Sequence, residues 1–380
     1  MNSDRRALLG ALGSVTVASV ATTDAASALA AAHTRERADR PEQTAERMPS
    51  IEAAGKAKVV DVHTHMYGRS WLAALKAAGD RDVHIEPGTA GDTLIYRWAK
   101  IGSLGSEFYD WDTRIQRMDA AGVDVAVVSL SAPNVYWGNR ATSLKAARDI
   151  NDEFAAAQHK YSGRIRWFAS LPWGDSNDAL SELRRAKDKG AVGVCTLTNI
   201  LGTPLTHERY RPIWGEIEAM RLPAFVHPTL PFNDGMGLDG AALANAIGFT
   251  SETSLCFARM MIEGFLDRFS KLRLIACHGG GALPYLATRL DRCWDRLIAD
   301  KQTREAPSTY LKRLYFDSIV YDNATLAHLV ETVGDDRVLY GSDYPFSLGD
   351  MTGVLARVDA LSPARRDRIR SGNARQLFDL

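Results

Sequence analysis

The chain has 380 residues, 46% of them hydrophobic and 24% charged. This composition is typical of a globular protein and excludes collagen-like and wholly disordered chains. Lys and Arg together number 46, as do Asp and Glu, so the formal net charge is zero. Without a broad positive field we expect no nucleic-acid partner. The four cysteines have no C-x-x-C spacing, so they predict neither a zinc ribbon nor a disulfide framework.

Residues 1–30 have the features of a bacterial twin-arginine export signal. Arg5 and Arg6 precede a weakly apolar run, and Ala28-Leu29-Ala30 is an A-x-A cleavage pattern. We therefore expect export to the periplasm or the extracellular space, with a mature chain that begins near Ala31. The alternative is a disordered, alanine-rich tail on a cytoplasmic protein. The apolar run is too short to act as a stable membrane anchor.

Residues 31–55 have the polar composition of a linker, so we expect the folded domain to span residues 56–380. Eight short apolar runs follow, and helical patterns separate most of them. Several runs are almost continuously apolar, as parallel strands buried on both faces require. This alternation predicts an α/β fold, a (β/α)₈ barrel of the TIM type, with a doubly wound open sheet as the structural alternative. The expected strands span residues 58–65, 123–130, 165–173, 191–197, 223–228, 272–279, 314–320 and 338–345.

Helical patterns cover residues 141–163, 176–190, 251–271 and 323–334. Residues 66–112 do not fit the alternation because the segment is too long for a turn and its patterning is mixed. We expect it to form an insertion over the barrel mouth, after the first strand.

Histidines and one aspartate stand at the carboxyl ends of four predicted strands, where parallel barrels build their active sites. His63 and His65 end the first strand, and alternate strand residues point to the same side. His227 ends the fifth strand, His278 the sixth and Asp343 the eighth. Each residue alone has a structural explanation, such as a hydrogen-bonded histidine or a turn-capping aspartate. Their placement at one end of four strands favours a metal site.

The donor types indicate which ion such a site holds. Imidazole and carboxylate ligands without a thiolate suit Zn²⁺ first, with Mn²⁺, Fe²⁺ or Co²⁺ as alternatives. The predicted fourth strand carries no lysine that would bridge two ions. We therefore expect one divalent metal per chain.

The motifs DVHTH, FVHP, CHGGGALPY and GSDYPF, in this order, resemble the amidohydrolase superfamily. Within it they are most similar to the branch typified by 2-amino-3-carboxymuconate-6-semialdehyde decarboxylase. The resemblance runs from about Val59 to the end of the chain, and it implies that His278 is the catalytic histidine. The metal ligands that it implies are His63, His65, His227 and Asp343.

The same resemblance implies contacts to a small carboxylate substrate. Arg289 matches an arginine that in this family reaches into the partner subunit's site, so we expect a homodimer. Arg97 is the best match to a second substrate arginine, although its spacing to the following RIQR segment differs from the family pattern. Phe346 matches a residue that lines the pocket.

The resemblance therefore implies a metal-dependent, non-oxidative decarboxylase of an unsaturated or aromatic carboxylic acid. The same set of residues can activate water against an amide, ester or lactone, so a metal-dependent hydrolase is the alternative. A metal-binding protein without turnover is disfavoured because it leaves His278 without a role. No G-x-S-x-G motif is present, which argues against a serine hydrolase.

Overall fold

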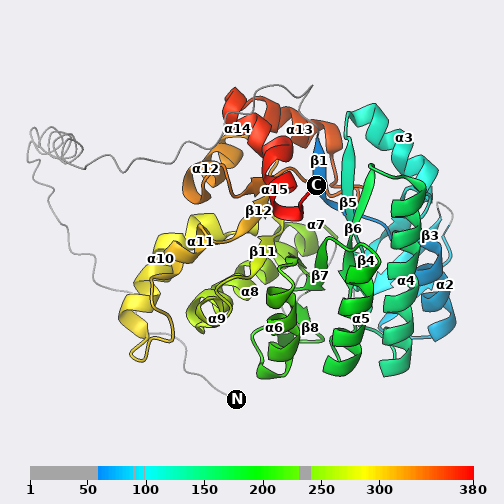
Figure 1. Ribbon diagram of the computed structural model, residues 1–380, viewed down its shortest axis with the longest axis horizontal. Helices are drawn as coiled ribbons and strands as arrows, with labels where there is room; N and C mark the ends of the chain where they lie inside the picture. Colours follow the sequence, from blue (N-terminus) through cyan, green and yellow to red (C-terminus); the bar gives the residue numbers. More distant parts are fainter. Residues whose placement is uncertain (1–58, 89–90, 98, 231–240) are drawn as a thin grey trace, which may run out of the picture. The chain divides into compact units, whose positions relative to one another are not determined.

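The computed structural model describes residues 59–88, 91–97, 99–230 and 241–380, so the expected leader and linker lie outside the described residues. Eight parallel strands form one sheet in the order β1-β5-β6-β7-β10-β11-β12-β13 (Figure 1). A parallel bridge between Thr64 and Tyr344 joins the last strand's loop to the first strand and closes the barrel. The predicted (β/α)₈ barrel is confirmed, and the open-sheet alternative is wrong. The strands are β1 (Val60–His65), β5 (Val125–Ser129), β6 (Ile165–Ser170), β7 (Gly193–Leu197), β10 (Pro223–His227), β11 (Arg273–Ala276), β12 (Tyr315–Asp317) and β13 (Val338–Leu339).

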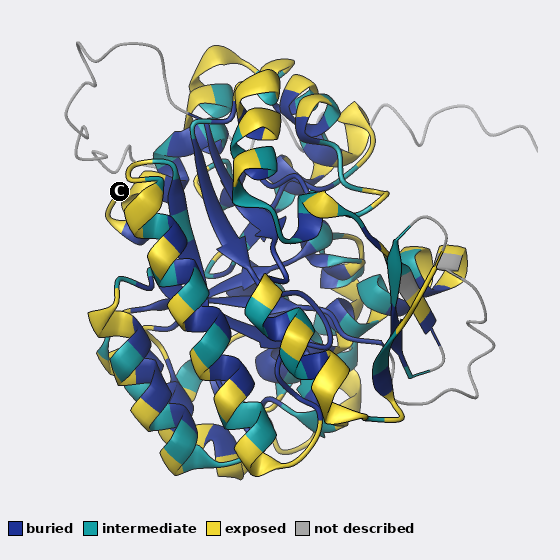
Figure 2. Cartoon of the chain, turned by 90° about the vertical axis from the view of Figure 1, so that its right-hand side faces the viewer, coloured by how far each residue is buried: buried dark blue, intermediate teal, exposed yellow. Residues whose placement is uncertain are grey.

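The strands are buried on both faces, which explains their nearly continuous apolar sequences. Every residue of β1, β5, β7 and β10 is buried. One face of each strand lines the barrel interior, and the other packs against the surrounding helices. Figure 2 shows this buried core, with helices whose outer faces are exposed.

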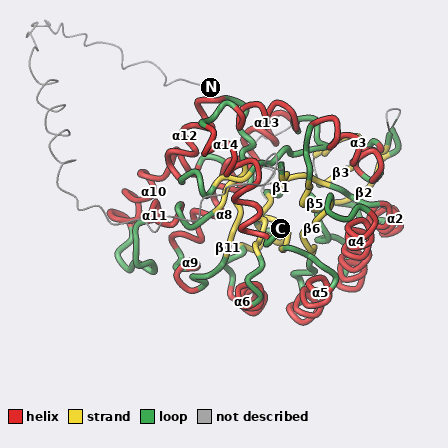
Figure 3. The backbone as a smooth tube through the Cα atoms, turned by 45° about the horizontal axis from the view of Figure 1, so that its top comes forward, coloured by secondary structure: helices red, strands yellow, loops and turns green. Residues whose placement is uncertain are grey.

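Helices surround the strands on the outside of the barrel (Figure 3). Several begin at a side-chain cap, such as Asn139 before α4, Asp175 before α5 and Asp322 before α12. The larger helices are α3 (Trp111–Ala121), α4 (Arg140–Lys160), α5 (Ser176–Asp188), α6 (Arg211–Ala219), α8 (Thr250–Ile262), α10 (Leu283–Leu297), α12 (Asn323–Val333) and α13 (Met351–Asp359). The shorter ones are α9 (Phe265–Arg268), α11 (Pro307–Leu311), α14 (Pro363–Asp367) and α15 (Asn373–Phe378).

The helix expected over residues 251–271 is broken in two. α8 ends at Ile262, and α9 begins after Gly264, whose φ of 70° is left-handed. A Cβ at this glycine would lie 2.4 Å from the carbonyl oxygen of Gln302. The break therefore depends on a close approach by a segment distant in sequence, which periodicity does not report.

The insertion after β1 is present as expected. It contains helix α2 (Arg69–Ala78) and a separate antiparallel sheet of β2 (Val83–Glu86), β3 (Asp92–Tyr96) and β4 (Ala99–Leu104). The Tyr96 hydroxyl lies 2.8 Å from Thr229 Oγ1, in the loop that follows β10. This contact ties the insertion to the carboxyl end of the barrel.

Aromatic and aliphatic side chains fill the barrel interior on the side away from that mouth. Helix α15 supplies Leu377 and Phe378 to the same apolar cluster as Phe168 and Phe225. The Phe168 ring stacks on Phe225 at 5.1 Å and meets Phe378 edge-on at 5.6 Å. The C-terminal helix thus closes the amino end of the barrel. No helix in the described part of the chain is both long and apolar enough to span a bilayer.

Candidate active site

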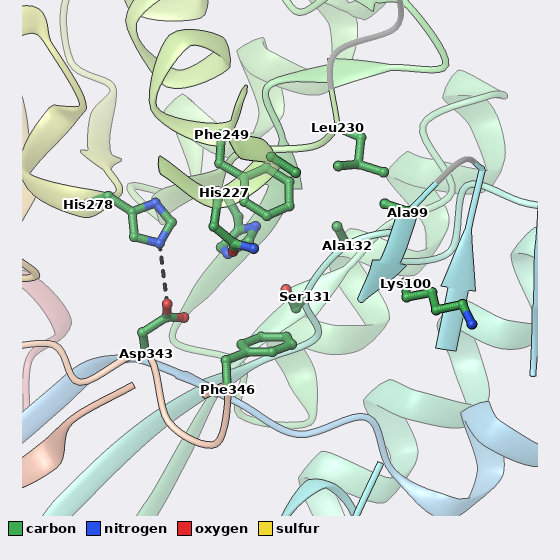
Figure 4. Close-up of a pocket in the computed structure, with 12 residues that line it drawn as sticks. Ala99, Lys100, Ser131, Ala132, His227, Leu230, Phe249, His278, Asp343 and Phe346 are labelled. Carbon is green, nitrogen blue, oxygen red and sulfur yellow. Dashed lines mark ion pairs between the residues drawn. The ribbon is translucent and has the colours of Figure 1, made fainter. Parts of the chain in front are cut away.

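The four histidines and the aspartate predicted from the sequence converge at the carboxyl end of the barrel. The Nε2 atoms of His63 and His65 are 3.0 Å apart. Asp343 Oδ1 lies 3.4 Å from His63 Nε2 and 3.2 Å from His65 Nε2. Asp343 Oδ2 lies 3.5 Å from His278 Nε2, and the His227 ring centroid lies 4.9 Å from that of His65. Residues from four strand ends therefore surround one point, and Figure 4 shows three of them, His227, His278 and Asp343.

A bulge in β1 brings both of its histidines to the interior. The register of β1 against β5 shifts between Asp61 and Thr64. Val60, before the shift, and Val62, within it, belong to the interior apolar cluster. His63 directly follows Val62, yet it also faces the interior, where its ring meets Phe225, and His65 lies beside it. An extra residue in one strand moves all later side chains to the opposite face, so the bulge permits this change.

The other two polar residues sit on turns with left-handed backbones. The φ angles are 54° at His278 and 59° at Asp343, which is uncommon for residues with a Cβ. Asp317 stabilises the first turn, because its carboxylate accepts the backbone N–H of His278 at 2.8 Å. The second turn is held by β1, where the His63 carbonyl accepts the Asp343 N–H at 2.8 Å.

Hydrogen bonds at Nδ1, on the side away from the shared centre, orient the rings of His63, His65 and His227. Each Nδ1 has a hydrogen-bond partner outside the cluster, so each Nε2 faces the shared centre. This is the arrangement of metal-binding histidines, whose second nitrogen is fixed by a neighbouring oxygen. The partners are Asp317 Oδ2 at 2.6 Å for His63, Ser129 Oγ at 3.0 Å for His65 and the Pro228 carbonyl oxygen at 2.8 Å for His227.

The surroundings of each residue in the cluster shift its pKa and so set its charge at neutral pH. Burial lowers the pKa of His65 to about 4 and holds the pKa of His227 well below its ordinary value, so both imidazoles are neutral at pH 7. Burial alone raises the pKa of Asp343, but the close approach of His278, His63 and His65 outweighs it and keeps the carboxyl ionised. Burial also opposes protonation of His63, yet the Asp317 carboxylate raises its pKa to about 9.

These residues fit a single divalent metal. His65 and His227 as neutral imidazoles and Asp343 as a carboxylate are in the protonation states that a metal requires, whereas His63, with its raised pKa, must release a proton when a metal binds. Among the described residues, the buried Asp343 Oδ1 has no hydrogen-bond donor. One donor atom from each of His63, His227, His278 and Asp343 lies within 4.8 Å of the others, and His65 is in contact with two of them. A divalent metal site is thus the arrangement that explains this buried polar cluster.

Asp317 was not among the site residues predicted from the sequence. It ends β12 and contacts both His63 and the backbone of His278. The rule that singled out the other residues, a polar side chain at the carboxyl end of a predicted strand, missed this aspartate because the predicted strand ran on to Val320, whereas β12 ends at Asp317.

A pocket opens above the cluster and is bordered by aromatic rings. Phe249, from the π-helix η4 (Ala244–Phe249), and Phe346, from the loop after β13, lie on opposite sides of it (Figure 4). Ser131 and Lys100 also line the pocket, and the Lys100 amino group points away from Asp343. The space between the two phenylalanine rings suits a flat, conjugated molecule.

The two predicted substrate arginines do not line this pocket. Arg97 lines a neighbouring hollow together with Tyr96 and Leu230, and Leu230 also borders the metal pocket. Arg289 is exposed on helix α10. Within the pocket lining of the described chain, Lys100 on β4 is the basic side chain that the insertion supplies.

The family model described as amidohydrolase matches residues 60–380. Gamma-resorcylate decarboxylase from a Rhizobium species is 32% identical over 286 residues, which cover 71% of this chain and 87% of that protein. 2-Amino-3-carboxymuconate-6-semialdehyde decarboxylase from Dictyostelium discoideum is 26% identical over 338 residues, which cover 84% of this chain and 91% of that protein.

Solved structures show the same similarity. The apo form of IDCase from Metarhizium anisopliae has a TM-score of 0.76 at 26% identity, covering 85% of this chain and 97% of that one. A dihydroxybenzoic acid decarboxylase from a Polaromonas species was solved with bound manganese and the inhibitor 2-nitroresorcinol. It has a TM-score of 0.69 at 25% identity, covering 86% of this chain and 98% of that one. The barrel, the order of its motifs and these matches together establish that the chain belongs to the amidohydrolase family.

Proposed function

We propose that this protein is a metal-dependent, non-oxidative decarboxylase of an unsaturated or aromatic carboxylic acid. The observation that carries the proposal is the cluster of imidazoles and one carboxylate beneath a pocket bordered by Phe249 and Phe346. The relatives reported above are named as decarboxylases of such acids, which favours a carboxy-lyase over the hydrolase alternative.

The residues proposed to hold the metal are His63, His65, His227 and Asp343. A divalent cation at this site supplies a Lewis acid that polarises a substrate oxygen. We propose Zn²⁺ as the native ion because imidazole and carboxylate ligands suit it. Mn²⁺ is the alternative, supported by the manganese in the Polaromonas relative.

His278 is the proposed proton donor. Its side chain is 16% exposed at the pocket, and its Nε2 lies 3.5 Å from Asp343 Oδ2. A histidine can hold and transfer a proton near neutral pH. It protonates the carbon that carries the carboxylate, the C–C bond then breaks, and its electron pair restores the conjugated system. CO₂ leaves, one proton is consumed, and His278 regains a proton from solvent.

Basic side chains are proposed to anchor the substrate carboxylate. Arg289 reaches the site of a second subunit in a homodimer, and its helix supports such an interface. On α10, Tyr285 is 83% exposed and Leu297 is 77% exposed, so this helix has apolar side chains available for such a contact. Arg97 stays a proposed substrate contact from the adjoining hollow.

The test of the proposed activity is a screen of aromatic and unsaturated carboxylic acids with the metal-loaded protein, monitored by CO₂ release. We expect stoichiometric CO₂ and the decarboxylated product, with His278→Ala as the inactive control. Turnover of amides, esters or lactones without any CO₂ from the acids would instead establish the hydrolase alternative.

Arg289→Ala tests the proposed carboxylate anchor. We expect the variant to have a raised KM for the substrate and an unchanged metal content. A monomer that is fully active in dilute sedimentation experiments would refute a site shared between subunits.

Export is proposed on the pattern of Arg5, Arg6 and Ala28-Leu29-Ala30. N-terminal sequencing of protein from fractionated native cells tests it, alongside the double variant Arg5→Lys, Arg6→Lys. We expect a mature start near Ala31 outside the cytoplasmic membrane. An intact Met1 in the cytoplasm, unaffected by the double change, would show that the leader is only a tail.

A further inference from the structure

A buried arginine stands where the barrel closes. Arg114, on helix α3, is 0% exposed. It donates one hydrogen bond from Nη1 to Thr64 Oγ1 and another from Nη2 to the carbonyl oxygen of His65. Its guanidinium carbon lies 4.4 Å from the centre of the Tyr344 ring. Among the described residues, no carboxylate lies within ion-pair distance of this guanidinium; the buried Asp61 carboxylate acts on it only from farther away.

Such a position is unfavourable for a cation unless the contacts compensate. Removing a guanidinium from water costs several kcal/mol when no charged partner is present. Burial lowers the pKa of Arg114 to about 10, although the group stays protonated at neutral pH. A methionine or leucine of similar volume would pack here without this penalty. The specific contacts of Arg114 must therefore explain why a charged residue occupies this buried position.

Those contacts lie on both sides of the seam between the first and last strands. β13 has only two residues, so the barrel closes through the loop that follows it. There the Tyr344 carbonyl accepts the His65 N–H at 2.7 Å and the Thr64 hydroxyl at 3.0 Å. Arg114 contacts Thr64 and His65 on one side and the Tyr344 ring on the other. It thus spans the seam with a rigid, planar group.

The proposed metal ligands are divided by the same seam. His63 and His65 lie on β1, and Asp343 lies in the loop after β13, next to Tyr344. Any change in the separation of β1 from this loop moves the carboxylate relative to the two imidazoles. Contacts that fix ligand orientation typically change metal affinity by about 10- to 100-fold when removed.

We propose that Arg114 is a positioning residue of the metal site, which sets the separation between the two β1 histidines and Asp343. The inference rests on the proposed metal site and deepens it. Arg114 acts through the β1 backbone and the Tyr344 ring, without touching metal or substrate. Its directional hydrogen bonds allow only one separation of β1 from the Tyr344 loop. An apolar side chain of equal volume would not fix this separation.

The test measures metal binding instead of turnover. Arg114→Met and Arg114→Lys are compared with the wild type by competition with a chelator and by the visible absorption spectrum of the Co²⁺-loaded protein. We expect Arg114→Met to weaken metal binding by about 10- to 100-fold and to alter the Co²⁺ spectrum. Arg114→Lys keeps the charge but not the planar fork, so its effect should be intermediate.

Arg164→Met is the matched control. Arg164 also donates to backbone carbonyls, those of Asp124 at 2.7 Å and Val123 at 3.2 Å, but it lies at the amino end of the barrel. We expect Arg164→Met to lower thermal stability while metal affinity and the Co²⁺ spectrum stay unchanged. If both arginine variants weaken metal binding equally, the role of Arg114 is only structural.

Thr64→Val provides a second variant in case Arg114→Met does not fold. It removes the hydroxyl that accepts from Arg114 and donates to the Tyr344 carbonyl. We expect weaker metal binding and an altered Co²⁺ spectrum in a folded protein. Unchanged metal affinity in the folded variants would overturn the proposal for Arg114, whereas a wild-type protein that binds no metal would overturn the metal site itself.

Discussion

The two ends of the barrel interior are both largely buried but are stabilised in different ways. On β10, Phe225 packs against other rings in the apolar layer, and His227, two residues later on the same side, joins the polar cluster. The apolar layer needs only close packing. The three strand histidines of the other layer each have a hydrogen-bond partner behind them, and Asp317 provides one. We therefore expect substitutions in the apolar layer to change folding stability and substitutions in the polar layer to change metal binding.

The largest expected effect on the polar layer comes from His63→Ala. This change removes one proposed ligand and leaves Asp317 without its imidazole partner. We expect the protein to fold but to lose its metal, and activity to fall to background. Elemental analysis of protein purified without chelator checks it, with about one metal per chain in the wild type, as a mononuclear site requires. Retention of a full equivalent of metal by the variant would exclude His63 as a ligand.

His278→Ala separates proton transfer from metal binding. His278 lies beside Asp343 at the pocket, and its Nδ1 has no hydrogen-bond partner among the described residues. We expect turnover to fall by about two to four orders of magnitude, the range for loss of a positioned acid or base, while metal content is unchanged. Steady-state kinetics and elemental analysis of the same sample measure both. A parallel loss of metal would reassign His278 as a ligand.

Asp317→Asn tests whether metal binding depends on the carboxylate that orients His63. The amide keeps the shape of the carboxylate but removes the charge that orients His63. We expect metal affinity to fall by about 10- to 100-fold, as measured by chelator competition. Asp322→Asn is the matched control, because an asparagine also caps a helix. Equal metal affinity in the two variants would show that the charge of Asp317 has no part in ligand orientation.

The polar layer was largely predictable from the sequence because parallel strands impose a simple geometry. Their carboxyl ends meet at one mouth, so polar residues that end separate strands must lie near one another. This argument brought His227, His278 and Asp343 together without any knowledge of the loops. It did not reveal the bulge in β1, because a single extra residue leaves the apolar run almost unchanged.

Features that depend on distant contacts were not predictable. The break at Gly264 follows from its approach to Gln302, which is far along the chain. The placement of Lys100 in the pocket and of Arg97 in the adjoining hollow depends on the hairpin of β3 and β4, whose register shifts between Leu94 and Ile95. Spacing along the sequence does not specify such a register.

Substitutions in the apolar layer should lower folding stability. They should have the smallest effect on metal binding. Phe378 is 6% exposed and packs edge-on against Phe168 at the amino end of the barrel. Phe378→Ala should lower the free energy of unfolding by about 3–5 kcal/mol, the usual range for loss of a buried phenylalanine. Phe378→Leu should have a smaller effect because it leaves a smaller cavity. Denaturant unfolding of the metal-free protein measures both, and chelator competition should give a metal affinity equal to that of the wild type. A large loss of metal affinity in folded Phe378→Ala would show that the two layers are coupled, since this side chain contacts none of the proposed ligands.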